Sequence, residues 1–187
     1  MVDLIQVALK VQAFCEERDW PFCIIGGLAL QFWGENRLTL DVDLTLLTGI
    51  GSESDFIEPL TNNFTIRIEN AEEFALRNRV LLLEIENVGI DISLGATEFE
   101  NAMIARAEYR EYLPDVKLKI CSAEDLIVMK SFAARPKDWI DVESVLARQA
   151  ELDWQYIKSM IEPLAEIHYD IDILGELEKR RKTFYQK

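Results

Sequence analysis

Apolar and polar residues alternate along RLTLDVDLTLL, residues 37–47, with the two-residue period that is typical of a β-strand. One face of this strand would carry Leu38, Leu40, Val42, Leu44 and Leu46, and the other Thr39, Asp41, Asp43 and Thr45. We therefore predict a strand with an apolar face toward the core and a polar face that carries two aspartates.

The surrounding pattern predicts an alternation of helices and strands over the first 120 residues. Helical spacing of apolar residues predicts a helix over residues 3–18. PFCIIGG, residues 21–27, predicts a short buried strand that ends at two glycines, with a helix over residues 28–35 directly after it. Further helices are expected at residues 52–60, with Ser52 or Ser54 as N-cap, and at residues 97–107, whereas AEEFAL could be a short helix or a turn. Further strands are expected at residues 64–69 and in VKLKIC, and two more within residues 79–95, joined as a hairpin near Glu86–Gly89.

The last third of the chain has only helical patterns. Ser122 followed by Asp125 resembles a capping box with Asp in place of Glu, Pro136 suits the first turn of the next helix, and Asp153 suits the N-cap of another. We expect an α+β fold in which a mixed β-sheet is flanked by helices and followed by a helical part. The predicted domains are an α/β core over residues 1–121 and a helical bundle over residues 122–187, packed on that core.

Length and composition limit the class of protein. The 187 residues are 49% hydrophobic, which is ample for a packed core. No apolar run approaches the roughly 18 residues that span a membrane, and the N-terminal segment lacks the pattern of a signal peptide. These features predict a cytoplasmic protein without a membrane partner.

Charge and rare residues exclude several chemistries. The chain has a single histidine, His168, which rules out HExxH zinc proteases and multi-histidine metal sites. His168 lies far from any glycine-flanked serine, which argues against a Ser-His-Asp triad, so we interpret it as a structural or surface residue. The three cysteines include no CxxC pair, which disfavours a zinc knuckle or a disulfide framework. A formal net charge of −14 argues against broad nucleic-acid binding. Any catalysis would therefore rest on carboxylates and a metal ion.

Asp41 and Asp43 would project side by side, with Cα atoms roughly 6.5–7 Å apart, because residues i and i+2 of a strand share a face. Two carboxylates so close repel unless a cation such as Mg²⁺ neutralises them. A calcium loop does not fit, because Leu46 and Ser52 stand where such a loop has glycine and glutamate. A solvent-facing strand remains the simple alternative.

Two further features strengthen the metal interpretation. If the strand containing VGIDISLG lies beside the first, Asp91 completes a cluster of three acids that could hold one or two Mg²⁺ ions and could help to deprotonate an attacking hydroxyl. Gly26 and Gly27 stand between a strand and a helix, where backbone N–H groups could face a phosphate. The two glycines are followed by 13 residues and then by Asp-x-Asp, a more specific pattern than either part alone.

This pattern resembles the signature of the polymerase-beta-like nucleotidyltransferase superfamily. The form R-x-T-x-D-x-D, with Arg37, Thr39, Asp41 and Asp43, is similar to the AbiEii-type branch, which includes toxins of abortive-infection toxin–antitoxin pairs. A second block of that branch matches SAEDLIVMKSFAARPKDWIDVESVL through Lys130, Lys137, Asp138 and Asp141. The resemblance covers roughly residues 20–150 and no part of the final segment.

The resemblance implies transfer of a nucleoside monophosphate from a nucleoside triphosphate such as ATP to an acceptor hydroxyl. Mg²⁺ would be held by Asp41, Asp43 and Asp91, and the nucleotide by Gly26, Gly27, Arg37, Thr39 and Lys130, with Asp138 or Asp141 supporting Lys130 or the acceptor. The acceptor could be tRNA, a protein or a small molecule, and a cognate antitoxin is an expected partner of a toxin.

Simpler interpretations stay open for several of these residues. Arg37 could pair with Glu35 or Asp41, Lys130 could be an exposed lysine on a helix, and Asp138 and Asp141 could serve only the helix dipole. The chain could also be an antibiotic-modifying enzyme, or an idle module of the same fold that binds or regulates a partner.

Overall fold

The computed structural model of the protein describes residues 4–167 and 171–185. They form two compact units, one of residues 1–28 and 38–121 and the other of residues 29–37 and 122–187. The segment 29–37, which follows the start of α2 in sequence, belongs to the helical unit.

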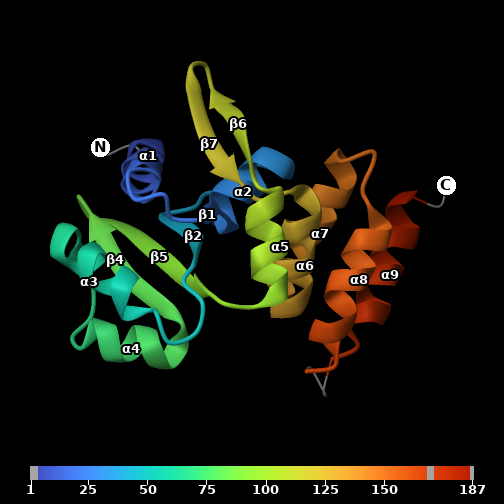
Figure 1. The fold of residues 1–187 in the computed structure, drawn as a ribbon. Helices are drawn as coiled ribbons and strands as arrows, with labels where there is room; N and C mark the ends of the chain where they lie inside the picture. The colour runs from blue at the N-terminus through green and yellow to red at the C-terminus, as the bar shows by residue number, and fades with distance from the viewer. Residues whose placement is uncertain (1–3, 168–170, 186–187) are drawn as a thin grey trace. The chain divides into compact units, whose positions relative to one another are not determined.

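The first unit is built on a seven-stranded mixed sheet with the strand order β3-β4-β5-β2-β1-β7-β6 (Figure 1). In chain order these strands are β1 (Phe22–Ile24), β2 (Asp41–Leu47), β3 (Thr65–Ile66), β4 (Val80–Ile85), β5 (Val88–Gly95), β6 (Glu108–Leu113) and β7 (Val116–Ile120). The pairs β2–β5 and β1–β7 are parallel, and the other neighbours are antiparallel. The helices of this unit are α1 (Leu4–Glu16), α3 (Ser54–Asn63), α4 (Ala71–Asn78) and α5 (Glu98–Arg106).

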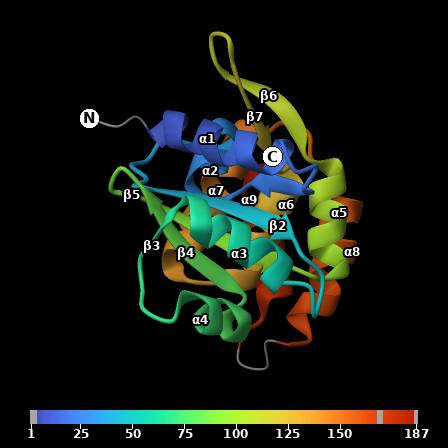
Figure 2. The same cartoon turned by 60° about the vertical axis from the view of Figure 1, so that its left-hand side comes forward.

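The apolar face of the central strands forms the core of this unit. Val42, Leu44 and Leu46 of β2 are at most 1% exposed. The alternating residues of the neighbouring strands are equally buried: Leu81, Leu83, Ile90, Ile92 and Leu94. The strands β2, β4 and β5 run side by side in Figure 2. The predicted division of β2 into an apolar and a polar face is thus present from Asp41 onward.

The start of β2 differs from the prediction. The strand begins at Asp41, and Leu38 and Leu40 are 80% and 70% exposed rather than part of the core. The partner strand β5 begins at Val88, just after a two-residue turn, so its ladder with β2 ends at the pair Asp41–Gly89. Residues 38–40 have the alternation of a strand, but they lie beyond the last residue pair of the β2–β5 ladder.

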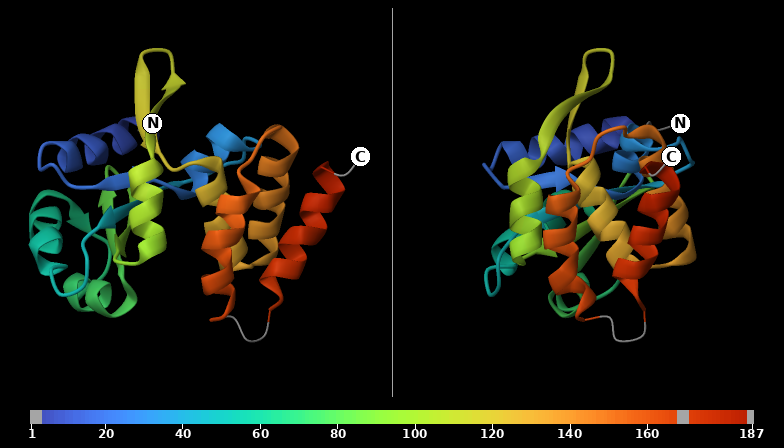
Figure 3. Two further views of the ribbon diagram at one scale, coloured as in Figure 1. Left: turned by 45° about the vertical axis from the view of Figure 1, so that its right-hand side comes forward. Right: turned by 90° about the vertical axis from the view of Figure 1, so that its right-hand side faces the viewer.

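The hairpin expected near Glu86–Gly89 is present as β4–β5. Its turn residues Glu86 and Asn87 both have positive φ, 53° and 67°, which is the conformation of a tight two-residue hairpin turn. A second hairpin, β6–β7, extends away from the rest of its unit (Figures 1 and 3). The sequence did not predict β6, because its residues are largely exposed on both faces and show no burial alternation.

One predicted helix cap is wrong. The N-cap of α3 is Glu53, not Ser52 or Ser54, and it makes no capping hydrogen bond with its side chain. The carboxylate of Glu53 instead accepts a hydrogen bond from the backbone N–H of Gly51 at 2.7 Å and pairs with Arg79. A tertiary ion pair has therefore replaced the local cap.

The second unit contains α6 (Ala123–Ala133), α7 (Pro136–Arg148), α8 (Trp154–Ala165) and α9 (Ile173–Tyr185), together with most of α2 (Gly26–Trp33), which begins in the first unit. The helices α6 to α9 lie side by side in Figure 3. Ser122 and Asp153 cap α6 and α8 as predicted, accepting hydrogen bonds from the N–H groups of Asp125 and Tyr156. Pro136 lies in the first turn of α7 as predicted.

Within the described residues, none of the helices is both long and apolar enough to cross a lipid bilayer.

Candidate active site

The acids of the first unit lie on adjacent strands. β2 and β5 pair in parallel register, so Asp43 is directly opposite Asp91 and Asp41 is opposite Gly89. Residues paired in this way share a face of the sheet. The structure therefore brings Asp91 next to the Asp-x-Asp strand, the arrangement on which the sequence interpretation depended.

Gly26 and Gly27 contact the polar residues of the same strand. A side chain at Gly26, whose φ is +59°, would place its Cβ 2.1 Å from Oδ2 of Asp43, and one at Gly27 would place its Cβ 2.2 Å from Oγ1 of Thr39. The backbone N–H of Gly27 donates a hydrogen bond to Asp43 Oδ2 at 3.3 Å. Both glycines are thus needed for the close approach of Asp43 and Thr39 to the first turn of α2.

The sequence analysis missed Arg67, which lies just after β3. Its Nη1 is 3.1 Å from Oδ1 of Asp91 and 3.8 Å from Oδ1 of Asp41. The segment FTIRIE showed the alternation of a strand, but only the strand order places its arginine beside two acids. The guanidinium supplies part of the neutralisation that we had assigned to Mg²⁺ alone.

Asp91 has the electrostatic properties of a proton acceptor. Burial raises the pKa of its carboxyl, Arg67 opposes that rise, and the nearby charge of Asp41 adds to it. Its Oδ1 is buried and finds no hydrogen-bond partner of good geometry among the described residues. A carboxylate with a raised pKa, whose buried oxygen is engaged only by a partly exposed arginine, is suited to accept a proton or to ligate a cation.

The donor set agrees with the chemistry of Mg²⁺, which takes one or two protein carboxylates and completes its shell with water and phosphate oxygens. Asp41, Asp43 and Asp91 supply such oxygens on one face. In the part of the chain that the structure describes, however, no three metal-ligating side chains are gathered closely enough to hold an ion as they stand. The three carboxylates share a face of the sheet but engage different partners. Asp43 accepts a hydrogen bond from Gly27, whereas Asp41 and Asp91 pair with Arg67.

The remaining predicted residues form an ion-pair network within the second unit. Lys130 Nζ lies 3.1 Å from Asp138 Oδ1 and 2.8 Å from Asp141 Oδ2. Arg37 donates two hydrogen bonds to Asp141, at 3.0 and 3.1 Å, and Arg135 donates to Asp138. We name Arg37, Lys130, Arg135, Asp138 and Asp141 the helical ion network.

The helical ion network overturns three of the simpler interpretations. The side chain of Lys130 is only 12% exposed, and those of Asp138 and Asp141 are 0% and 4% exposed, so the lysine does not reach into solvent and the acids do more than face the helix dipole. Arg37 pairs with Asp141, a residue 104 positions later in the chain, rather than with Glu35 or Asp41. Such a partner cannot be found from local sequence.

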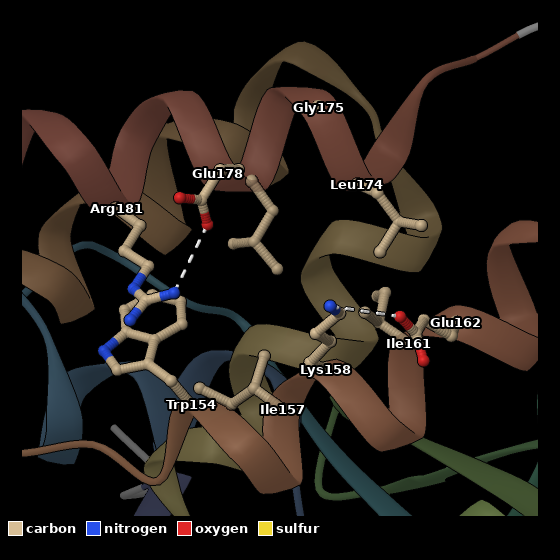
Figure 4. Close-up of a pocket in the computed structure, with 10 residues that line it drawn as sticks. Trp154, Ile157, Lys158, Ile161, Glu162, Leu174, Gly175, Glu178 and Arg181 are labelled. Atoms are coloured by element: carbon tan, nitrogen blue, oxygen red, sulfur yellow. Dashed lines mark hydrogen bonds and ion pairs between the residues drawn. The ribbon is translucent and has the colours of Figure 1, made fainter.

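Basic residues of the segment 178–182 make ion pairs and ring contacts within the second unit. Arg180 pairs with Glu143 and stacks on Trp139, and Arg181 stacks on Trp154. Between α8 and α9 lies a half-open groove of about 520 Å³ (Figure 4), lined by Trp154, Ile157, Lys158, Ile161, Glu162, Leu174, Gly175, Leu177, Glu178 and Arg181. None of the predicted site residues lines this groove, and His168 lies outside the described residues.

Comparison with known proteins identifies a family. Residues 2–185 match the model of a family described as "Nucleotidyltransferase of unknown function (DUF6036)". No curated protein matches the sequence.

Several solved structures have a similar fold. The solution structure of the antibiotic-resistance factor ANT(2'')-Ia is 16% identical, with a TM-score of 0.58 over 96% of this chain and 97% of that one. A crystal structure of ANT(2'')-Ia with adenylyl-2''-tobramycin is 17% identical, with a TM-score of 0.56 over 88% and 98% of the two chains. The lincosamide antibiotic adenylyltransferase LnuA, bound to lincomycin, is 13% identical, with a TM-score of 0.52 over 75% and 95%. At these identities the likeness concerns the fold, which is that of a nucleotidyltransferase.

Proposed function

The chain belongs to the DUF6036 family of nucleotidyltransferases, and from that premise we propose that it transfers a nucleoside monophosphate from ATP or another nucleoside triphosphate to a hydroxyl of a small molecule. One observation carries the assignment of the site: Asp43 and Asp91 are paired across parallel strands, directly beside the glycine turn at Gly26-Gly27. An acid pair next to a helix start that can face phosphate is what phosphoryl chemistry requires.

The residues have separate roles in the proposed reaction. Asp41 and Asp43, together with Asp91, would hold Mg²⁺, which would supply neutralisation of charge on the triphosphate. Asp91, whose carboxyl has a pKa raised by burial, would accept the proton of the acceptor hydroxyl. The hydroxyl oxygen then forms a bond to the α-phosphorus, the bond from that phosphorus to the bridging oxygen breaks, and pyrophosphate leaves. The glycine turn at Gly26 and Gly27, with Thr39 beside it, would position the phosphates, and the N–H of Gly27 also holds Asp43 at this turn.

The helical ion network has a supporting role in this proposal. An ammonium group has three donors, and two carboxylates engage Lys130. Asp138 and Asp141 thereby hold Lys130 in place within the helical unit. Arg37 shares Asp141 with Lys130 and is positioned with it.

A small acceptor is supported better than a nucleic acid. The net charge of −14 disfavours contact with an RNA backbone and suits a cationic molecule. Structural neighbours of the same fold carry tobramycin and lincomycin, both hydroxylated small molecules, which supports the same class of acceptor here.

A toxin of the AbiEii type, with tRNA or a protein as acceptor and an antitoxin as partner, is the second candidate. It is favoured by the sequence Arg37-x-Thr39-x-Asp41-x-Asp43, which resembles that branch. An idle module of this fold is the third, and the retention of three acids on one face speaks against it.

The decisive experiment incubates the protein with Mg²⁺ and each labelled nucleoside triphosphate. Aminoglycosides, lincosamides, a pool of small-molecule metabolites, bulk tRNA and a protein extract serve as acceptors in parallel. We expect label to transfer to a small molecule and pyrophosphate to appear in equal amount. Transfer to tRNA or to protein would favour the toxin instead, and no transfer to any acceptor would overturn the enzymatic proposal.

A matched pair of glycine substitutions tests the glycine turn. Gly26 and Gly49 both have positive φ, +59° and +74°, but only at Gly26 would a Cβ strike Asp43, since nothing lies within 4 Å of a Cβ at Gly49. Gly26→Ala and Gly49→Ala should each lose about 1–2 kcal/mol of unfolding free energy to the left-handed backbone. Gly26→Ala should in addition lower the transfer rate about a hundredfold by displacing Asp43. Equal rates in the two variants would show that Asp43 need not approach the turn.

A further inference from the structure

Arg67 lies in the same row of the sheet as the two opposed acids. Its backbone N–H donates to the carbonyl oxygen of Leu82 at 3.1 Å, which continues the β3–β4 ladder by one residue. Leu82 is opposite Asp91 on β5, and Asp91 is opposite Asp43 on β2. The arginine is therefore anchored by backbone pairing at the edge of the polar face, two strands away from Asp91.

The side chain of Arg67 reaches back across this row to the acids. Its Nη1 makes a close ion pair with Asp91 at 3.1 Å and a longer one with Asp41 at 3.8 Å. The space that it occupies exists because residue 89 is glycine: a Cβ at Gly89 would lie 2.2 Å from Nη1 of Arg67 and 2.2 Å from Oδ1 of Asp41. The guanidinium and the Asp41 carboxylate thus meet directly over Gly89.

The ion pairs of Arg67 with Asp91 and Asp41 are more exposed to solvent than those of the helical ion network, so they separate more easily. The side chains of Arg67, Asp91 and Asp41 are 27%, 34% and 51% exposed, whereas Lys130, Asp138 and Asp141 are nearly buried. A partly exposed ion pair contributes little stability, and water can solvate its members when they separate. Arg67 itself can be solvated when it leaves the two acids, and the buried Oδ1 of Asp91 is then left for another cation to pair with.

We propose that Arg67 is a displaceable counter-ion of the acid site. When no cation is bound, its guanidinium neutralises Asp41 and Asp91. It has to leave them before they bind a divalent cation, so Arg67 sets the concentration of cation at which the site fills. This inference rests on the proposed site but adds to it a residue that competes with the cation rather than one that assists it.

The orientation of the side chains supports this role. The three acids share a face yet form no cluster tight enough for a metal ion within the described residues, and the arginine stands between two of them. The buried Oδ1 of Asp91 is paired with Arg67 but accepts no hydrogen bond of good geometry, so the arginine satisfies this oxygen only in part and a cation could replace it. A positive group and a metal ion cannot occupy the same pair of oxygens together.

Cation binding without nucleotide or acceptor tests the inference directly. Mn²⁺, which like Mg²⁺ prefers oxygen ligands, is titrated into each variant while electron paramagnetic resonance measures the free ion. Arg67→Gln and Arg67→Ala remove the competing charge and should bind Mn²⁺ roughly three- to tenfold more tightly than the wild type, in proportion to a partly exposed ion pair. Arg67→Lys keeps a positive charge and should stay within about twofold of the wild type.

Two control variants make the result specific. Arg77→Gln removes one positive charge from an exposed position of α4 in the same unit and should leave the affinity within about twofold of wild type, because a distant exposed charge is screened. Asp43→Asn should abolish the tight binding in either background, which places the ion at the acid site. Circular dichroism verifies that each variant is folded.

Several outcomes would overturn the inference. One is Mn²⁺ binding by Arg67→Gln and Arg67→Ala that is equal to or weaker than that of the wild type, and another is an equal gain of affinity in Arg77→Gln. A third is the absence of Mn²⁺ binding in every variant. A fourth is loss of folding in both Arg67→Gln and Arg67→Ala, which would show that Arg67 has a structural role. Because none of these measurements uses nucleotidyl transfer, they are separable from the proposed function. An active enzyme with unchanged affinity in Arg67→Gln would refute the counter-ion alone, and tighter binding in an inactive protein would refute the activity alone.

Discussion

Asp43→Asn is expected to lower kcat/KM for nucleotidyl transfer by at least about a hundredfold while leaving the protein folded. The substitution removes the charge that would hold Mg²⁺ beside the glycine turn. The remaining amide oxygen can still accept the hydrogen bond that Gly27 donates to the carboxylate. The loss of activity should therefore come from lost electrostatic stabilisation and not from a changed turn. The rate of pyrophosphate release, measured with the acceptor found in the screen, determines it.

The matched control is Asp115→Asn, which removes the same charge from an exposed turn. Asp115 has φ of 62°, a conformation that asparagine adopts readily, so its activity should equal that of wild type. Without divalent ions, Asp43→Asn should unfold at the same temperature as the wild type or slightly above it, because it removes a negative charge from a face that carries two others. A melting temperature several degrees lower would make Asp43 a structural acid, and activity close to that of wild type would remove it from the catalytic machinery.

The second large effect is expected in the helical unit. Asp138→Ala should lower the free energy of unfolding by about 3–5 kcal/mol, because it leaves the nearly buried ammonium group of Lys130 with one of its two acids. Urea unfolding, followed by the fluorescence of Trp139 and Trp154 in the same unit, measures this loss. Lys137→Ala, at an exposed neighbour on the same helix, should change the free energy by no more than about 0.5 kcal/mol. Equal losses in both variants would show that the helical ion network contributes no more to the free energy of unfolding than an exposed lysine does.

The pH dependence of the same variant gives an independent test. Burial raises the pKa of Asp138, but hydrogen bonds from Arg135 and Lys130 and their charges outweigh it and hold the pKa below the usual 3.8. A carboxyl whose pKa is lowered by folding stabilises the fold above its unfolded pKa, and this contribution disappears as the pH falls through the folded pKa. The difference in the free energy of unfolding between wild type and Asp138→Ala should thus have its largest value at pH 7 and decrease below about pH 3.8. A difference that stays constant down to pH 2.5 would assign the loss to packing.

The elements predicted with success depend on neighbours in sequence. The hairpin β4–β5 follows from a turn that two left-handed residues close, and the caps at Ser122 and Asp153 follow from side chains that reach N–H groups three residues on. The buried face of β2 follows from period-two alternation. In each case the interaction that stabilises the element spans only a few positions, so composition and spacing reveal it.

The errors concern interactions between distant segments. Leu38 and Leu40 continue the alternation of β2, yet they are exposed, because β5 begins only at Val88 and its ladder with β2 starts at the pair Asp41–Gly89. The predicted serine cap of α3 is absent, and the N-cap residue Glu53 instead pairs with Arg79, 26 positions later.

The sequence by itself determined the kind of site: two glycines at a strand end, Asp41 and Asp43 on a polar strand face, and Asp91 on another, together with the family resemblance that the family match supports at the level of nucleotidyltransferase. Only the tertiary structure decided how the charges are balanced. It placed Asp91 opposite Asp43, put Arg67 over Gly89, and joined Lys130 and Arg37 to Asp141. The physical reason is that a strand's face is set by its own period, whereas the partner of a charge is set by strand order and helix packing.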